Sequence, residues 1–94
     1  MAIRILIYGK EGDGGAYAAL AQIRTIVREL QVDADVQIIT DERQLKMNGV
    51  DTPPAVAIDG SMVSMGYVPS RNEMLRYIQQ RQETIASIHP EESM

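Results

Sequence analysis

Residues 51–74 read DTPPAVAIDGSMVSMGYVPSRNEM, and this stretch carries the strongest structural signals in the chain. Two prolines interrupt any helix or strand before them, and the apolar run Ala55–Ile58 that follows predicts a strand. Asp59 and Gly60 form a pair that is typical of two-residue hairpin turns, whose central residues need positive φ. We therefore expect Met62–Met65 to form a strand antiparallel to Ala55–Ile58.

A helix is expected directly after this hairpin. Ser70 and Glu73 have the spacing of a capping box, in which each side chain accepts a hydrogen bond from the other residue's backbone N–H. Beyond residue 82 the helical pattern thins. The sequence therefore predicts one domain over residues 1–82 and a C-terminal extension, residues 83–94, made of helix and a frayed tail. The apolar residues that would place the helix on a sheet are Met74, Leu75 and Ile78.

The elements upstream follow from their periodicity. Ala2–Tyr8 is apolar on both faces apart from one arginine, which predicts a central strand. Ala16–Leu30 repeats apolar residues every three or four positions and is expected to be a helix. Val32–Ile38 alternates apolar and polar residues, as an edge strand does, and Asp41–Asn48 suits a short helix. The order β-α-β-α-β-β-α predicts an α/β fold with a four-stranded mixed sheet and helices on both faces.

The loop Gly9–Gly15, GKEGDGG, joins the first strand to the first helix. Asp13 or a neighbouring glycine could cap that helix. A glycine-rich loop before a helix can hold a phosphate, but this one fits neither known phosphate-binding fingerprint and carries two acids, which favours a flexible turn. Glu11, Asp13 and Asp51 have no spacing that a metal ion demands, so no metal site is predicted.

Composition excludes several function classes. The 94 residues suffice for one domain, and the absence of cysteine excludes disulfides, thiolate metal sites and thiol catalysis. The net charge of −4 argues against a nucleic-acid or anionic-membrane partner. No apolar run approaches the ~20 residues of a membrane span. We expect a cytoplasmic protein without a cofactor.

The order of elements, together with Pro54–Ser70, resembles the small thioredoxin-like proteins of the glutaredoxin-sized, redox-active disulfide family. The likeness extends from residue 2 to about residue 80. In that family a Cys-x-x-Cys motif follows the first strand, and its cysteines correspond to positions near Gly12 and Gly15. Both cysteines are absent, and thiol-disulfide exchange requires a thiolate. The chain is therefore not expected to be an enzyme.

The resemblance also implies a remnant active-site face. Pro54 occupies the position of the family's cis-proline, and the residue before it would pair with an extended substrate through its backbone. That residue is Pro53, which has no N–H, so this substrate-holding group is also impaired. The residues of the predicted face are Gly12, Asp13, Gly14, Gly15, Thr52, Pro53, Pro54 and Gly66.

Two functions remain open from the sequence. The preferred one is a non-catalytic thioredoxin-like module that binds a protein partner, with a second copy of itself among the candidates. The alternative is a small-ligand or redox-related carrier that uses the remnant glutathione or anion pocket.

The C-terminal stripe is the second candidate surface. Ile85 and Ile88 continue the helical spacing, and a helix reaching Ser87 would carry them past the sheet, which favours self-association through them. The other interpretation is that they contact the edge of their own domain. The methionines inside elements are expected in the core or at its rim; these are Met47, Met62, Met65 and Met74.

Overall fold

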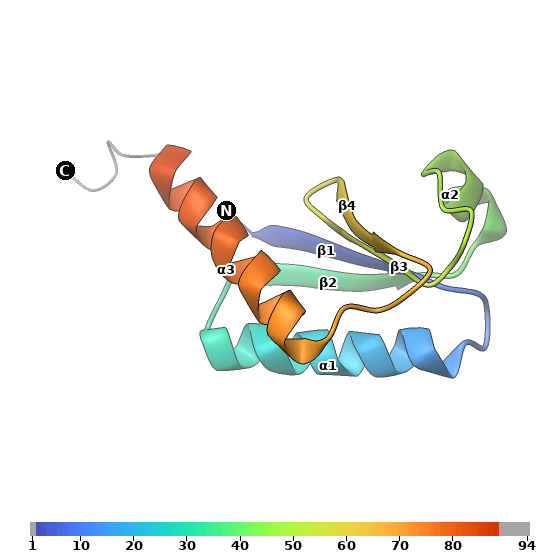
Figure 1. Ribbon diagram of the computed structural model, residues 1–94, viewed down its shortest axis with the longest axis horizontal. Helices are drawn as coiled ribbons and strands as arrows, with labels where there is room; N and C mark the ends of the chain where they lie inside the picture. The colour runs from blue at the N-terminus through green and yellow to red at the C-terminus, as the bar shows by residue number, and fades with distance from the viewer. Residues whose placement is uncertain (1, 89–94) are drawn as a thin grey trace.

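The seven elements follow one another in the predicted order (Figure 1). The computed structural model describes residues 2–88 and, within them, the side chains of residues 2–85. The observed order of elements and the four-stranded mixed sheet confirm the predicted order and fold class. The elements are β1 (Ile3–Tyr8), α1 (Gly14–Leu30), β2 (Ala34–Ile39), α2 (Glu42–Met47), β3 (Ala55–Ile58), β4 (Ser61–Met65) and α3 (Arg71–Ile88).

The four strands form one mixed sheet in the order β2-β1-β3-β4. β1 pairs parallel to β2 and antiparallel to β3, and β3 pairs antiparallel to β4. β1 is central and almost wholly buried, as its apolar sequence predicts, whereas β2 and β4 lie at the edges. The alternation that indicated an edge strand in β2 is confirmed, because Asp35 and Gln37 are exposed between half-buried neighbours.

One face of the sheet carries the main core. α1 and α3 cover this face together, so their apolar stripes meet the isoleucines of β1 (Figure 1). The stripe on α3 continues to Ile85, which is half-buried and packs against this core. The fully buried side chains of the main core include Ile3, Ile5, Ile7, Ile23, Ile26, Met74 and Ile78.

The opposite face carries a smaller core under α2. Leu45 of α2 and Val50 after it pack on Tyr8, Ala55 and Ala57, which alternate along their strands with the residues of the main core. Helices therefore lie on both faces, as predicted. α2 has only six residues, so it covers one end of this face, which we call the α2 face.

The first helix begins two residues earlier than predicted and ends, as predicted, at Leu30. Asp13 caps it by accepting a hydrogen bond from the Gly15 N–H at 2.9 Å, so α1 begins at Gly14 rather than Ala16. At the other end Gln31 takes a left-handed conformation with φ 54°, and the Val32 N–H donates to the Val27 carbonyl at 3.1 Å. The prediction that Val32 starts the second strand is therefore wrong, because its N–H and apolar side chain complete the end of α1.

The local signals around the hairpin are confirmed. Asp59 and Gly60 have φ values of 48° and 85°, as a two-residue turn of this kind requires. The backbone N–H groups of Ser70 and Glu73 each donate to the other residue's side chain at 3.2 Å, so the capping box forms and α3 begins at Arg71.

The end of α3 changes the interpretation of the C-terminal stripe. The helix continues through the expected boundary at residue 82 to Ile88. Of the two interpretations of Ile85, the structure supports contact with its own domain, because this side chain packs against the main core. The Ile88 side chain and the predicted tail after it lie outside the described residues.

The methionines divide into two groups. Met74 is 1% exposed and belongs to the main core, as expected. Met62 and Met65 are each 37% exposed and pair with residues of the smaller core, which fits the expected rim, whereas Met47 is 79% exposed, which the sequence did not predict. Within residues 2–88, no helix is both long and apolar enough to cross a membrane.

Candidate functional site

The strand register brings four loops to one end of the sheet. Tyr8 at the end of β1 pairs with Ile39 at the end of β2 and with Ala55 at the start of β3. Ala55 in turn pairs with Met65 at the end of β4. The segments that adjoin these residues therefore meet at one edge, which we call the sheet end. It comprises residues 9–15, 40–41, 51–54 and 66–67.

The proline turn and the end of β4 are joined directly. The Pro53–Pro54 peptide bond is cis. The Gly66 N–H donates to the Pro54 carbonyl at 2.8 Å, and Gly66 has a φ of 86°. A Cβ on Gly66 would also lie 3.4 Å from Thr52 Cγ2, so glycine suits this position both by conformation and by space. The structure thus brings Thr52, Pro54 and Gly66 together, as the predicted face requires.

The glycines of the Gly9–Gly15 loop have different roles. A Cβ on Gly9 would lie only 2.5 Å from the Ala16 Cβ, so Gly9 allows the loop to pack on α1. Gly12 has a φ of 82° and therefore turns the chain before the helix. Gly14 faces open space, and the carboxylate of Asp13 is occupied by capping α1. The loop contains no Cys, Ser, Thr or His side chain that could act as a nucleophile or as its base.

Comparison with known proteins decides the family. The family model described as "Thioredoxin domain" matches residues 3–79, most of the chain. The chain belongs to this thioredoxin domain family. It is also 30% identical over 76 residues to a thioredoxin of Methanothermobacter thermautotrophicus, in an alignment that covers 81% of this chain and 97% of that protein. The resemblance seen in the sequence is therefore confirmed.

This thioredoxin domain contains no cysteine anywhere in its 94 residues. The positions assigned to the family's cysteines, Gly12 and Gly15, lie immediately before and within the first turn of α1. Among residues 2–88 the structure contains no group of three or more His, Asp or Glu residues placed to hold a metal ion. Glu11, Asp13 and Asp51 are accordingly not brought together as a metal site.

α2 adds two hollows to the sheet end that sequence reasoning missed. One, of about 220 Å³, lies between the glycine loop and the proline turn, and Lys10, Lys46 and Pro53 line it together with residues of α2. The other is larger, about 600 Å³, and is lined by Lys10, Glu11, Thr40 and the start of α2. Both hollows are lined by basic and acidic side chains. No pattern in the sequence shows that α2 folds over the loop, because the two are more than 25 residues apart.

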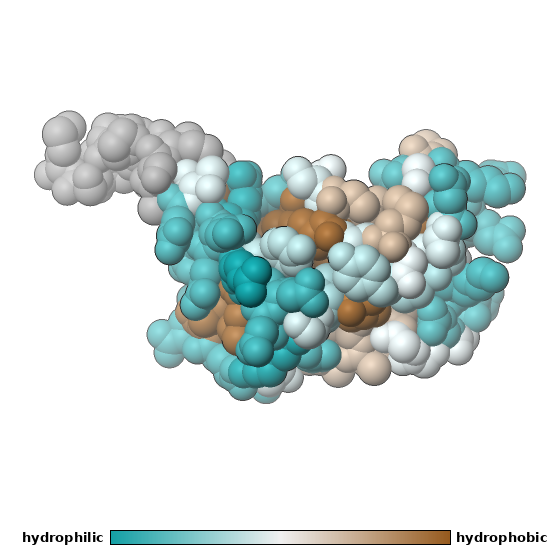
Figure 2. Space-filling view, in the orientation of Figure 1, coloured by the Kyte–Doolittle hydropathy of each residue, from teal (hydrophilic) through white to brown (hydrophobic). Residues whose placement is uncertain are grey.

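Exposed apolar side chains gather at and around the sheet end. Tyr17 lies in the first turn of α1, Met47 ends α2, and Met65 and Tyr67 flank Gly66. These four side chains are between 37% and 79% exposed, and only Met62 joins them among the described residues as an exposed large hydrophobic side chain. Figure 2 shows apolar surface over β4 and the chain beside it, next to the hydrophilic surface of α3.

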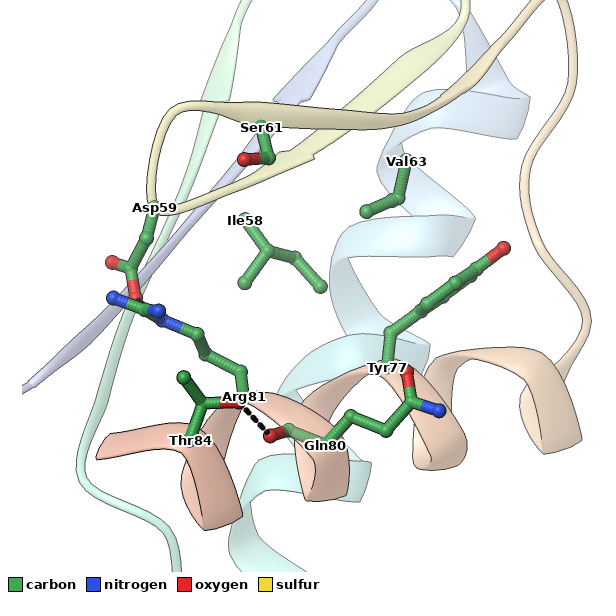
Figure 3. Close-up of a pocket in the computed structure, with 8 residues that line it drawn as sticks. All are labelled: Ile58, Asp59, Ser61, Val63, Tyr77, Gln80, Arg81 and Thr84. Carbon is green, nitrogen blue, oxygen red and sulfur yellow. Dashed lines mark hydrogen bonds and ion pairs between the residues drawn. The ribbon is translucent and has the colours of Figure 1, made fainter. Parts of the chain in front are cut away.

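A third hollow, of about 210 Å³, lies away from the sheet end between the β3–β4 turn and α3 (Figure 3). Ile58 and Val63 form its apolar wall, with Tyr77 at one side. Asp59 and Arg81 face each other at the opposite side, and Arg81 Nε donates to Asp59 Oδ2 at 2.6 Å.

Asp59 also binds the backbone of β1. Its Oδ1 accepts a hydrogen bond from the Arg4 N–H at 2.8 Å, while its own N–H donates to the Arg4 carbonyl at 2.7 Å. Burial acts to raise the pKa of the Asp59 carboxyl, but the hydrogen bond from Arg4 and the hydrogen bond and charge of Arg81 outweigh it, so this pKa lies below its ordinary value. Asp59 therefore links the β3–β4 turn to β1 and to α3. The hollow beside it does not reach the sheet end.

Proposed function

We propose that this thioredoxin domain is a non-catalytic module that binds a protein partner through its sheet end. The observation that carries the proposal is the exposure of four large apolar side chains in segments that lie at or lead to the sheet end: Tyr17, Met47, Met65 and Tyr67. Tyrosine and methionine are enriched in the cores of protein interfaces, where an aromatic ring supplies a large contact area at low entropic cost.

The non-catalytic part rests on chemistry. Thiol-disulfide exchange begins with attack by a thiolate, and this chain has no sulfur that can form one. Gly12 and Gly15 carry no side chain in place of the family's cysteines. Lys10, the basic residue of the loop, is exposed, so it lacks the desolvation that activates a lysine amine.

The binding part rests on which groups the sheet end offers. Pro53 has no N–H, so an extended partner can use only its carbonyl at this position. The Pro54 carbonyl already accepts from Gly66. Recognition therefore depends on side chains more than on a backbone ladder, and the exposed tyrosines and methionines are the groups able to provide it.

Photo-crosslinking tests this surface directly. Benzoylphenylalanine is placed at Tyr17 or Tyr67 in separate variants, and the matched control places it at Arg24, which is exposed on α1 away from the sheet end. After illumination in the cells that make the protein, we expect the two tyrosine positions to yield the same protein adduct and Arg24 to yield none of it. Equal adducts from all three positions, or none from the tyrosines, would contradict the proposal.

A second copy is one form that the partner can take, and sedimentation distinguishes it. A dimer whose mass falls to that of a monomer in Tyr67→Glu identifies the partner as the chain itself. A monomer that still gives the crosslinked adduct identifies a different protein.

The alternative function, a carrier of a small anionic ligand, is supported by the hollow between loop and proline turn. Lys10 and Lys46 both line it, although Glu42 lies between them. A ligand that binds only the folded state stabilises it by about 2.7 kcal/mol at a hundredfold excess over Kd. Melting with millimolar glutathione or phosphate therefore tests this function, and an unchanged melting temperature favours the protein-binding module.

A further inference from the structure

The thioethers of three methionines are open to solvent. Met47 is 79% exposed, and Met62 and Met65 are each 37% exposed, whereas Met74 is 1% exposed in the main core. With no cysteine in the chain, methionine is its only source of sulfur. The reaction of a thioether with an oxidant depends on access to the sulfur, so these residues differ strongly in expected reactivity.

The three exposed methionines also frame one surface. Met62 pairs with Ala57 and Met65 pairs with Ala55. Directly paired residues point to the same face, and both alanines belong to the smaller core under α2. Met62 and Met65 therefore lie on the α2 face, and Met47 ends the helix that covers part of it. We call these three residues the methionine rim.

The chain around Met62 and Met65 is uncharged. Between Asp59 and Arg71 no residue carries a formal charge, and this segment includes β4, an edge strand of the sheet. The surface over β4 is thus apolar rather than charged, in agreement with the apolar colour there in Figure 2. A modification that makes Met62 and Met65 polar therefore makes the surface over β4 more polar.

We propose that the methionine rim is a modification site, at which a peroxide oxidises Met47, Met62 and Met65 to sulfoxides in the folded protein. The sulfur lone pair attacks one peroxide oxygen, an S–O bond forms, the O–O bond breaks, and the departing oxygen leaves as water when the peroxide is hydrogen peroxide. Sulfur loses two electrons and the peroxide gains them. Each event replaces an apolar side-chain atom with a strongly polar group.

The consequence for binding rests on the proposed function above. Met65 and Tyr67 flank Gly66, so a sulfoxide at Met65 places a polar oxygen beside an aromatic residue of the proposed interface. A sulfoxide that loses its water on binding, without a hydrogen-bond donor opposite it, weakens the complex. Oxidation of the rim therefore lowers the affinity for the partner without unfolding the domain.

The chemical half is tested by peptide mapping. The folded chain is treated with dilute hydrogen peroxide, quenched, and cut with trypsin and with an enzyme that cleaves before aspartate. This separates Met47 and Met74 from the peptide with Met62 and Met65, whose fragment ions resolve the pair. We expect Met47 to react fastest, the pair to follow, and Met74 to be at least about tenfold slower than Met47. In guanidinium all four should react at similar rates.

Equal oxidation rates for Met47 and Met74 in the folded chain would overturn the proposal, as would rates for Met62 and Met65 as low as that of Met74.

Binding is tested with Gln at all three rim positions as a polar mimic of the sulfoxide, against Leu at the same positions as the apolar control. The Tyr67 crosslink should fall at least about fivefold in the Gln variant and persist in the Leu variant. An unchanged crosslink in the Gln variant would refute the binding consequence. Absence of the crosslink in the wild type would refute the proposed function and still leave the oxidation rates as a test of the site.

Discussion

Replacing Asp59 by asparagine removes one charge from the link between the β3–β4 turn, β1 and α3. Asparagine tolerates the left-handed conformation that Asp59 adopts, with φ 48°, so the turn itself is preserved. Its side-chain oxygen still accepts from the Arg4 N–H, but its amide nitrogen cannot accept from Arg81. The substitution therefore isolates the Asp59–Arg81 interaction.

The magnitude follows from the environment of the pair. Hydrogen bonds to charged groups contribute ~1.5–3 kcal/mol, and solvent screening lowers this value at partly exposed positions. The side chains of Arg81 and Asp59 are 33% and 20% exposed. We expect Asp59→Asn to lower the free energy of unfolding by about 1–2 kcal/mol at pH 7, which lowers the melting temperature of a domain of this size by roughly 4–16 °C.

The pH dependence provides the sharper test. Because the pKa of Asp59 is lower in the folded state, the charged carboxyl stabilises the fold above its unfolded pKa of ~3.9, and this stability is lost as pH falls through the folded pKa. The difference between wild type and variant should thus be constant above about pH 5 and shrink as the pH falls through the folded-state pKa. Urea unfolding across this range measures it.

Two controls sharpen the assay. Asp33→Asn changes an exposed aspartate whose side chain makes no hydrogen bond in the described part of the chain, and it should cost less than about 0.5 kcal/mol. Arg81→Met with Asp59→Asn completes a double-mutant cycle for the pair. A cost for Asp59→Asn no larger than that of the control, or a difference that does not shrink as the pH is lowered below the unfolded pKa, would refute the reasoning.

Three further predictions concern packing and capping. Gly9→Ala should destabilise the fold by about 1–3 kcal/mol because its Cβ would lie 2.5 Å from that of Ala16, whereas Gly14→Ala meets open space and should be neutral or stabilising in the same denaturation assay. Ile85→Ala should cost about 1–2 kcal/mol, since the side chain is half-buried in the main core, and should leave the sedimenting mass unchanged; a loss of dimer would restore the stripe as an interface. Ser70→Ala should cost about 1 kcal/mol and increase amide exchange in the first turn of α3; unchanged exchange would show that the capping box is dispensable.

The fold could be predicted from the sequence where short-range chemistry decides it. The hairpin depends on Asp59 and Gly60, and the start of α3 depends on Ser70 and Glu73; in each case neighbouring residues determine the geometry. Val32 shows the limit. The alternation of apolar and polar residues predicted that the second strand begins at Val32. Instead α1 ends with Gln31 in the left-handed conformation, which is uncommon outside glycine, and Val32 belongs to this helix end.

The site was predictable only in part, for a related reason. The resemblance to a family implies that Pro54 and Gly66 lie on one face, and in the structure a backbone hydrogen bond joins these two residues. The exposure of Met47 could not be read from the sequence, because α2 is too short for its periodicity to show which side faces solvent. The sequence left two interpretations of Ile85 open because residue spacing does not give the angle at which α3 crosses the sheet.

The central claim is that this domain keeps the thioredoxin fold without its redox chemistry, and a disulfide-reduction assay tests it most directly. Insulin serves as the disulfide substrate, dithiothreitol as the electron donor, and a thioredoxin with both cysteines as the positive control. Because thiol-disulfide exchange requires a thiolate and the chain has no cysteine, adding it should leave the rate at the dithiothreitol background. A reproducible acceleration by the pure protein, in proportion to its concentration, would contradict the account.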